Sequence, residues 1–312
     1  MACSFPQEIL DAIVAELDDG SLKQCSLSGW SLLLPARRSI FRSISIFQGE
    51  VRNKQGSDKL LVRGYRKLLN LVQILENDPS RLPSRTREGC QTLASCIRWL
   101  ELGIASNDSR AFDEDAVFAL TMSPQEQQYA ASLPLPVVLD RLAHVESVWL
   151  HSSHASTTIW CLVDPTITSA IVKFLRCPTI KALAINHIHG FPADTIIHCP
   201  NLSDLTLDGV HGDDSTDLIN ILAALQSLTQ PVLFEPSYPP PSLERLHSRA
   251  SEAFLTTLIN TPKMAVAFKN LRELFLQNAA IHVFRAELLA VNAVASTLQI
   301  LRISGNLSDH GT

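Results

Sequence analysis

A helical spacing of apolar residues opens the chain between residues 5 and 17. Its members recur every three or four positions, with polar residues between them: Phe5, Ile9, Leu10, Ile13, Val14 and Leu17. Such spacing places apolar side chains on one face of an α-helix. Pro6 fits the first helical turn, where its missing N–H needs no partner, and Ser4 or Phe5 is then the cap. The pattern predicts one short amphipathic helix.

Two further helices are predicted before residue 46. Residues 18–21 supply turn-forming side chains and a new N-cap, and an apolar stretch follows over residues 22–30. Pro35 interrupts this stretch, and residues 37–41 begin a third helix. Three short helices bury too little apolar surface to offset the entropy lost in ordering them. We therefore expect this segment to need a partner.

A short aliphatic repeat marks the rest of the chain. Its clearest copies lie in residues 177–185 and 199–207, where Cys-Pro precedes an aliphatic-x-x-aliphatic-x-aliphatic pattern at an offset of 22 residues. We expect two adjacent parallel strands, with Ile180 beside Leu202 and Leu183 beside Leu205. The same pattern occurs in residues 97–102, 145–150, 243–248, 270–276 and 298–303, and the copy in residues 243–248 lacks its last aliphatic residue, at Ser248.

Helical stretches are expected between these copies, over residues 65–75, 137–142, 166–175, 218–228, 254–260 and 283–294. Residues 108–128 and the proline-rich residues 231–241 indicate exposed insertions. The alternation of strands and helices predicts an α/β fold. It resembles an irregular leucine-rich-repeat solenoid, a resemblance that implies a curved parallel sheet with helices on its convex side. A partner protein is expected on the concave side, at polar positions bordering the clearest pair of strands: Lys181, Asn186, Ser203, Thr206 and Asp208.

The first segment resembles an F-box of the mushroom-type fungal (basidiomycete) kind. Cys25-Ser26-Leu27, Pro35-Ala36-Arg37-Arg38 and Phe41-Arg42 match that family's pattern. The remainder resembles an irregular leucine-rich-repeat solenoid. The two resemblances together imply an F-box-like helical module over residues 1–48. They also imply a repeat domain over residues 49–312. No helix is expected after the last strand, residues 298–306, so either this domain lacks a polar cap or the sequence is a fragment, incomplete at its C-terminal end.

The F-box resemblance implies a function. F-box proteins bind a Skp-type adaptor of cullin–RING ubiquitin ligases, and the chain would be the substrate-recognition subunit of such an SCF ligase, with an unknown target protein on its repeat domain. The adaptor-binding residues would be Phe5, Pro6, Ile9, Leu10, Ile13, Leu17 and Leu27.

The same segment also departs from the family. Ser28, Gly29 and Trp30 replace the family's Val, Cys and Arg, and Leu32 replaces its tryptophan. The alternative is a non-catalytic repeat scaffold whose decayed F-box no longer binds the ligase.

Composition narrows the remaining choices. A net charge of −5 and a pI near 6.1 disfavour a nucleic-acid-binding surface. No secretory signal or bilayer-spanning helix is predicted, and seven scattered cysteines without CxxC spacing suit the reducing cytoplasm or nucleus. No nucleotide-binding or hydrolase motif occurs, so we expect no catalytic residues and no cofactor. His187, His189, His198 and Cys199 are the best candidate metal cluster, but ordinary strand and loop positions explain them better, and no metal is predicted.

Overall fold

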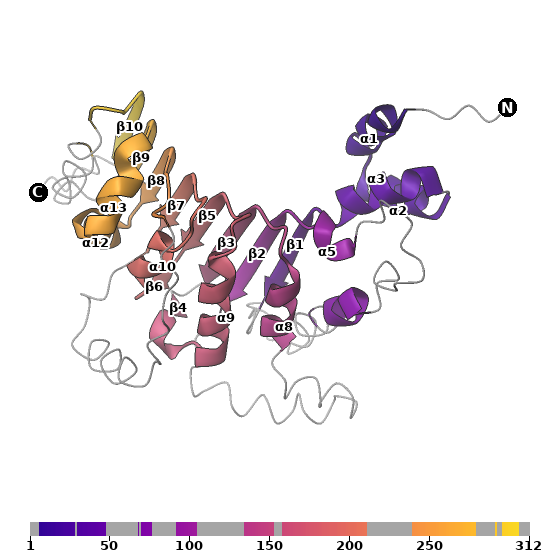
Figure 1. Cartoon of the computed structure of the whole chain (residues 1–312), viewed down its shortest axis with the longest axis horizontal. Coiled ribbons are helices and arrows are strands. Elements are labelled where there is room, and N and C mark those ends of the chain that lie inside the picture. Colours follow the sequence, from indigo (N-terminus) through magenta and orange to yellow (C-terminus); the bar gives the residue numbers. More distant parts are fainter. Residues whose placement is uncertain are drawn as a thin grey trace, which may run out of the picture.

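The computed structural model describes residues 6–28, 30–47, 68, 70–76, 92–104, 134–152, 158–210, 239–278, 291 and 295–305. Eight described strands form one parallel sheet, whose spatial order follows the chain along an arc (Figure 1). They are β1 (Ser43–Phe47), β2 (Trp99–Ile104), β3 (Ser147–Ser152), β5 (Ala182–Asn186), β7 (Asp204–Asp208), β8 (Arg245–Arg249), β9 (Glu273–Asn278) and β10 (Ile300–Gly305). Two short strands, β4 (Thr158–Ile159) and β6 (Ile188–His189), pair separately.

The helices between these strands lie on one side of the sheet (Figure 1). They include α5 (Leu93–Cys96), α8 (Pro134–Arg141), α9 (Pro165–Leu175), α10 (Ala193–Ile197), α12 (Glu252–Asn260) and α13 (Pro262–Ala267), with 3-10 turns η3 (Trp160–Leu162) and η5 (Phe268–Asn270). The α/β expectation is confirmed. Helices over residues 137–142, 166–175 and 254–260 are also confirmed, and residues 65–75 are helical where they are described. The expected stretches 108–128 and 218–228 lie outside the described residues, as do most of 231–241 and 283–294.

The aliphatic repeat positions of β2, β3, β5, β7, β8 and β9 form the core between sheet and helices, whereas Leu301 and Ile303 of β10 are exposed. Strands β5 and β7 are adjacent and parallel, with Leu183 opposite Leu205 and Ile185 opposite Leu207, as predicted. Ile180 and Leu202 also lie in the core, although each precedes its strand. Because successive strand residues point to opposite faces, burying the aliphatic ones sends those between them to the other face.

The strand starts share one backbone arrangement. The carbonyl of Glu146 accepts hydrogen bonds from the N–H groups of Lys181 and Ala182 at 2.8 and 3.1 Å. The carbonyl of Lys181 does the same for Ser203 and Asp204, at 2.8 and 3.0 Å. Equivalent carbonyls accept two successive N–H groups at Arg42, Arg98, Ser203, Glu244 and Arg272. This ladder keeps all eight strands in one register.

The strand ends also repeat a conformation. The residue that follows β5, β7 or β8 has a positive φ, 54° at His187, 60° at Gly209 and 46° at Ala250. Each donates its N–H to a backbone carbonyl at the end of the following strand. His187, Gly209 and Ala250 donate to Asp208, Arg249 and Gln277, respectively. Gly209 is the tightest of the three positions, because an added Cβ would lie 2.5 Å from Nδ1 of His187.

Three helices precede the sheet: α1 (Gln7–Ala15), α2 (Asp19–Ser28) and α3 (Trp30–Ile40). Their shared core is small, with Val14, Leu22 and Ala36 buried. Asp18 caps α2 by accepting from the backbone N–H of Ser21 at 2.9 Å, which also lowers the pKa of its carboxyl. The N-cap predicted within residues 18–21 is thus confirmed at Asp18, whereas residues 19–21 belong to α2 and form no separate turn.

Two details of the helical prediction are wrong. Pro6 is the N-cap of α1 and lies outside the helix, so neither Ser4 nor Phe5 caps it. Pro35 does not end a helix but lies inside α3, where it is buried beside Ala36. A proline inside a helix forfeits one backbone hydrogen bond, and packing against the core offsets that loss here.

Strand β1 was missing from the predicted repeats. Phe41, Ile44 and Ile46 follow the same aliphatic or aromatic spacing, and β1 pairs with β2 as the first strand of the sheet. This strand falls within the range 1–48 assigned to the helical module. The division at residue 48 stays a prediction.

The left-handed turns give a stability test. Gly209→Ala should lower the free energy of unfolding by about 1–3 kcal/mol, since it adds backbone strain and a clash with His187. The matched change Ala250→Gly relieves the same kind of strain and should not destabilise the chain. Urea unfolding of the two variants measures the contrast, and equal losses of stability would contradict this account of the turns.

The two faces of β7 provide a second test. Leu205→Asp places a carboxylate in the core, where its desolvation should unfold the middle of the sheet. Thr206→Asp changes a residue on the opposite face and should cost less than about 1 kcal/mol. Circular dichroism and urea unfolding separate the two variants, and a tolerated Leu205→Asp would show that the face assignment is wrong.

Candidate functional site

The sheet face opposite α8, α9 and α12, here called the open face, carries alternate residues of all eight strands. Strand register aligns these residues in rows that cross the sheet. The middle row contains Ser45, Glu101, Trp149, Ala184, Thr206, His247, Phe275 and Arg302. Side chains that are far apart in sequence therefore meet on one surface.

An aromatic cluster occupies the open face of β2 and β3. The ring centroids of Trp99 and Trp149 lie 6.1 Å apart, and those of Trp149 and His151 lie 5.2 Å apart. Nε2 of His151 lies 3.3 Å from Oε1 of Glu101. With its amide oriented to satisfy both neighbours, Asn186 accepts from the indole N–H of Trp149 at 3.0 Å. These contacts hold the tryptophans in fixed orientations.

Ion pairs occupy the open face of β7 and β8. Arg245 lies opposite Asp204 and binds it through Nε and Nη2, the latter 2.7 Å from Oδ2. The hydrogen bonds and the nearby carboxylate raise the pKa of Arg245 further above its usual value. Arg249 lies opposite Asp208, with Nε 3.7 Å from Oδ1. Opposite charges that face each other across strands stabilise the pairing, so these four charges largely neutralise one another.

An aromatic contact follows on β8 and β9. The rings of His247 and Phe275 meet edge to face, with centroids 4.2 Å apart. Burial lowers the pKa of His247, so the imidazole is neutral at pH 7. Among the described residues, its buried Nε2 has no hydrogen-bond partner.

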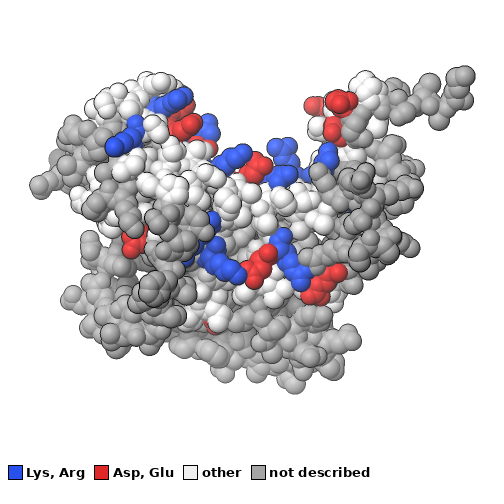
Figure 2. Space-filling view, in the orientation of Figure 1, with Lys and Arg blue, Asp and Glu red and all other residues white. Residues whose placement is uncertain are grey.

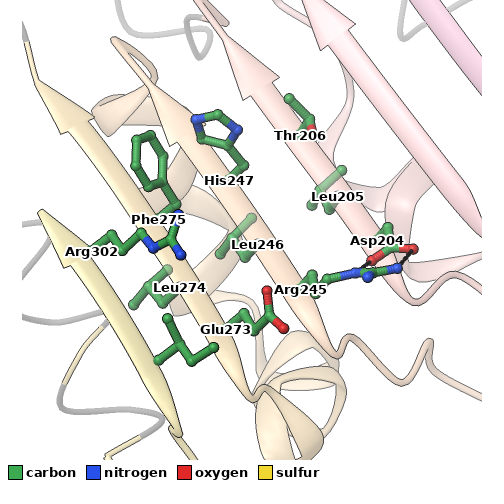
Figure 3. A pocket seen from close by; sticks show the side chains of 11 residues that line it. Asp204, Leu205, Thr206, Arg245, Leu246, His247, Glu273, Leu274, Phe275 and Arg302 are labelled. Atoms are coloured by element: carbon green, nitrogen blue, oxygen red, sulfur yellow. Dashed lines mark hydrogen bonds and ion pairs between the residues drawn. The ribbon is translucent and has the colours of Figure 1, made fainter. Parts of the chain in front are cut away.

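An open depression of about 490 Å³ crosses strands β7 to β10 (Figure 3). Its border includes three core residues of the strands, Leu205, Leu246 and Leu274. The side chains of the open face around it are Asp204, Thr206, Arg245, His247, Glu273, Phe275, Ile300 and Arg302. Figure 2 shows acidic and basic residues interspersed along the hollowed upper edge of the molecule, without an extended area of one sign.

The five predicted target-binding residues lie at two places. Asn186, Thr206 and Asp208 are on the open face, half-buried among neighbouring side chains. Lys181 and Ser203 lie just before β5 and β7, in the hydrogen-bonded ladder at the strand starts. Whether any of them contacts a target stays a prediction.

The predicted adaptor-binding residues also divide into two groups. Ile9, Ile13 and Leu27 are exposed, at 45%, 50% and 81% of their surface. Leu10 and Leu17 are half-buried, and Leu17 packs against the small core of the three helices. Pro6 is exposed at the start of α1, and Phe5 lies outside the described residues.

Sequence reasoning missed the aromatic and arginine residues of the open face. The available signal was the residue between the last two aliphatic positions of each repeat, which must point away from the core. That position holds Trp149 in β3, His247 in β8, Phe275 in β9 and Arg302 in β10. Reading each repeat for this residue would have found the middle row.

No group of three or more histidine, cysteine or acidic residues suited to a metal ion occurs in the described part of the chain. The described cysteines, Cys25, Cys96, Cys161, Cys177 and Cys199, are free thiols. Burial raises the pKa of the Cys199 thiol to about 12. Among the described helices, none is both long and apolar enough to cross a bilayer.

Comparison of the chain with models of protein families found no match. Comparison with curated proteins likewise found no match.

The hydrogen bond between Trp149 and Asn186 can be tested by a double-mutant cycle. Asn186→Ala should cost on the order of 1 kcal/mol in the wild-type background and clearly less in a Trp149→Phe background, where the indole N–H is absent. Urea unfolding of the four proteins gives the coupling energy. Strictly additive losses would show that the two side chains do not interact.

Proposed function

We propose that the chain is a substrate-recognition subunit of a Skp–cullin–F-box ubiquitin ligase. In this proposal α1–α3 are an F-box-like module that binds a Skp-type adaptor, and the sheet is an irregular leucine-rich-repeat solenoid that holds a target protein on its open face. The chain itself catalyses no reaction. It raises the effective concentration of the target near the ligase. Its free cysteines suit a cytoplasmic or nuclear location.

The observation that carries the proposal is the exposed apolar surface of α1 and α2. Ile9 and Ile13 are four residues apart on α1, and about half of each side chain is exposed. Residues four apart lie on one face of a helix. A three-helix unit with so small a core gains little from leaving these side chains in water, and a protein partner would bury them.

The junction between helices and sheet supports a role as a connecting subunit. Only Phe41 and Arg42 separate α3 from β1, and Phe41 packs against the core of the sheet. The carbonyl of Arg42 accepts from the N–H groups of Arg98 and Trp99, both at 2.9 Å. Figure 1 shows α1–α3 beyond the β1 end of the sheet. A partner on α1 would thus be held at a fixed direction from a partner on the open face.

The second candidate is a repeat scaffold with a decayed F-box. It rests on the departures from the family pattern, above all Leu32, which packs beside the small core of α1–α3 where the family has a larger side chain. In that case the open face would still bind a protein, but the exposed surface of α1 would bind no adaptor.

Co-purification with a Skp-type adaptor tests the proposal. The double variant Ile9→Asp with Ile13→Asp should lose the adaptor, since each carboxylate would be desolvated in the contact. The matched control, Val137→Asp, changes an exposed apolar residue of α8 and should keep it. Circular dichroism checks that all variants are folded.

Each outcome has a clear reading. Adaptor bound equally by the wild type and the double variant would show that this interface is wrong. A folded wild type that binds no adaptor would favour the decayed scaffold.

A further inference from the structure

The depression on the open face has the dimensions of a peptide site. It spans β7 to β10, and three spacings between parallel strands amount to about 14 Å. Small-molecule sites usually enclose most of their ligand, whereas this depression is partly open along the sheet. An extended segment of about four residues would cover its length.

The apolar part of the depression lies on β8 to β10. Phe275 and Ile300 provide apolar surface, and Ile300 is 41% exposed. The imidazole of His247 packs against Phe275 and adds no charge, because burial keeps it neutral. An aliphatic or aromatic side chain of a partner would bury this surface.

Two charges of the depression remain available to a ligand. Asp204 and Arg245 neutralise each other through their two contacts. Glu273 lies opposite Arg245 on the neighbouring strand, and its charge contributes to the raised pKa of Arg245. Within the described residues, however, neither Glu273 nor Arg302 makes an ion pair, and Figure 3 shows their side chains apart. They lie diagonally on neighbouring strands, with Cα atoms about 8 Å apart. The depression thus offers one anion and one cation beside an apolar surface.

We propose that this depression binds an extended segment of the target protein in which an apolar side chain lies between an acidic and a basic residue. The acidic residue pairs with Arg302, the basic residue pairs with Glu273, and the apolar side chain packs on Phe275 and Ile300. The assignment rests on the proposed function for the existence of a target, and adds the chemistry by which that target is recognised.

Four labelled decapeptides serve as the probe. The first places leucine between glutamate and lysine at alternate positions, so that all three side chains point the same way in an extended chain. The others replace the glutamate, the lysine or both by glutamine. Fluorescence anisotropy with the purified full chain should show that each charge tightens binding about threefold to fivefold, the range expected for partly exposed ion pairs.

Two variants then assign each charge to its partner. Arg302→Gln should abolish the gain in affinity that the peptide glutamate gives and keep the gain that the peptide lysine gives. Glu273→Gln should do the reverse. The matched control Lys173→Gln removes an exposed charge from α9 on the helix-covered side and should leave both advantages intact.

Several results would overturn the proposal. These are absence of binding by all four peptides, equal binding of all four, or a variant that loses the advantage of the wrong charge. The adaptor experiment depends on α1 and α2, so loss of peptide binding with adaptor binding retained would refute this site alone. If the chain binds no adaptor but Arg302→Gln and Glu273→Gln still change peptide binding as predicted, only the ligase assignment is refuted.

Discussion

Stacking of the aliphatic repeat in strict register is the constraint on which the rest of the structure depends. The repeats from β2 to β9 bury their aliphatic residues between sheet and helices, as Leu183 and Leu205 do on neighbouring strands. Paired N–H groups from the next strand bind the carbonyl before each strand, as Lys181 and Ala182 bind Glu146. A slip by one residue would bring the open-face side chains into the core, so hydrophobic burial fixes the arrangement of the open face as well as the fold.

The open face that results is chemically divided. Its first half holds the fixed tryptophans Trp99 and Trp149, and its second half holds paired charges and the depression. Rigid aromatic side chains are frequent energetic centres of protein interfaces, because they bury a large area at a low entropy cost. Paired charges contribute less to affinity and more to the choice of partner. The described face therefore suits a protein that recognises one partner by several moderate contacts.

The sequence predicted the repeats well where neighbouring copies share their context. The shared Cys-Pro before Ile180 and Leu202 allowed register to be assigned residue by residue. It failed at β1, because Ile44 and Ile46 follow directly on a helical segment and were read as part of it. It also failed at Pro35, where tertiary packing overrides the local preference of proline. The depression could not be predicted, since it depends on which side chains four chain-distant strands bring together.

The central claim is that the helices and the open face bind two different proteins at the same time. Hydrogen–deuterium exchange of the full chain, with and without a purified Skp-type adaptor, tests this most directly. The account predicts slower exchange in α1 and α2 on adding the adaptor, because amides at a buried interface open less often. Exchange in β7 to β10 should stay unchanged, which leaves that surface available to a target. Protection of β7 to β10 by the adaptor, with none in α1 or α2, would contradict the claim.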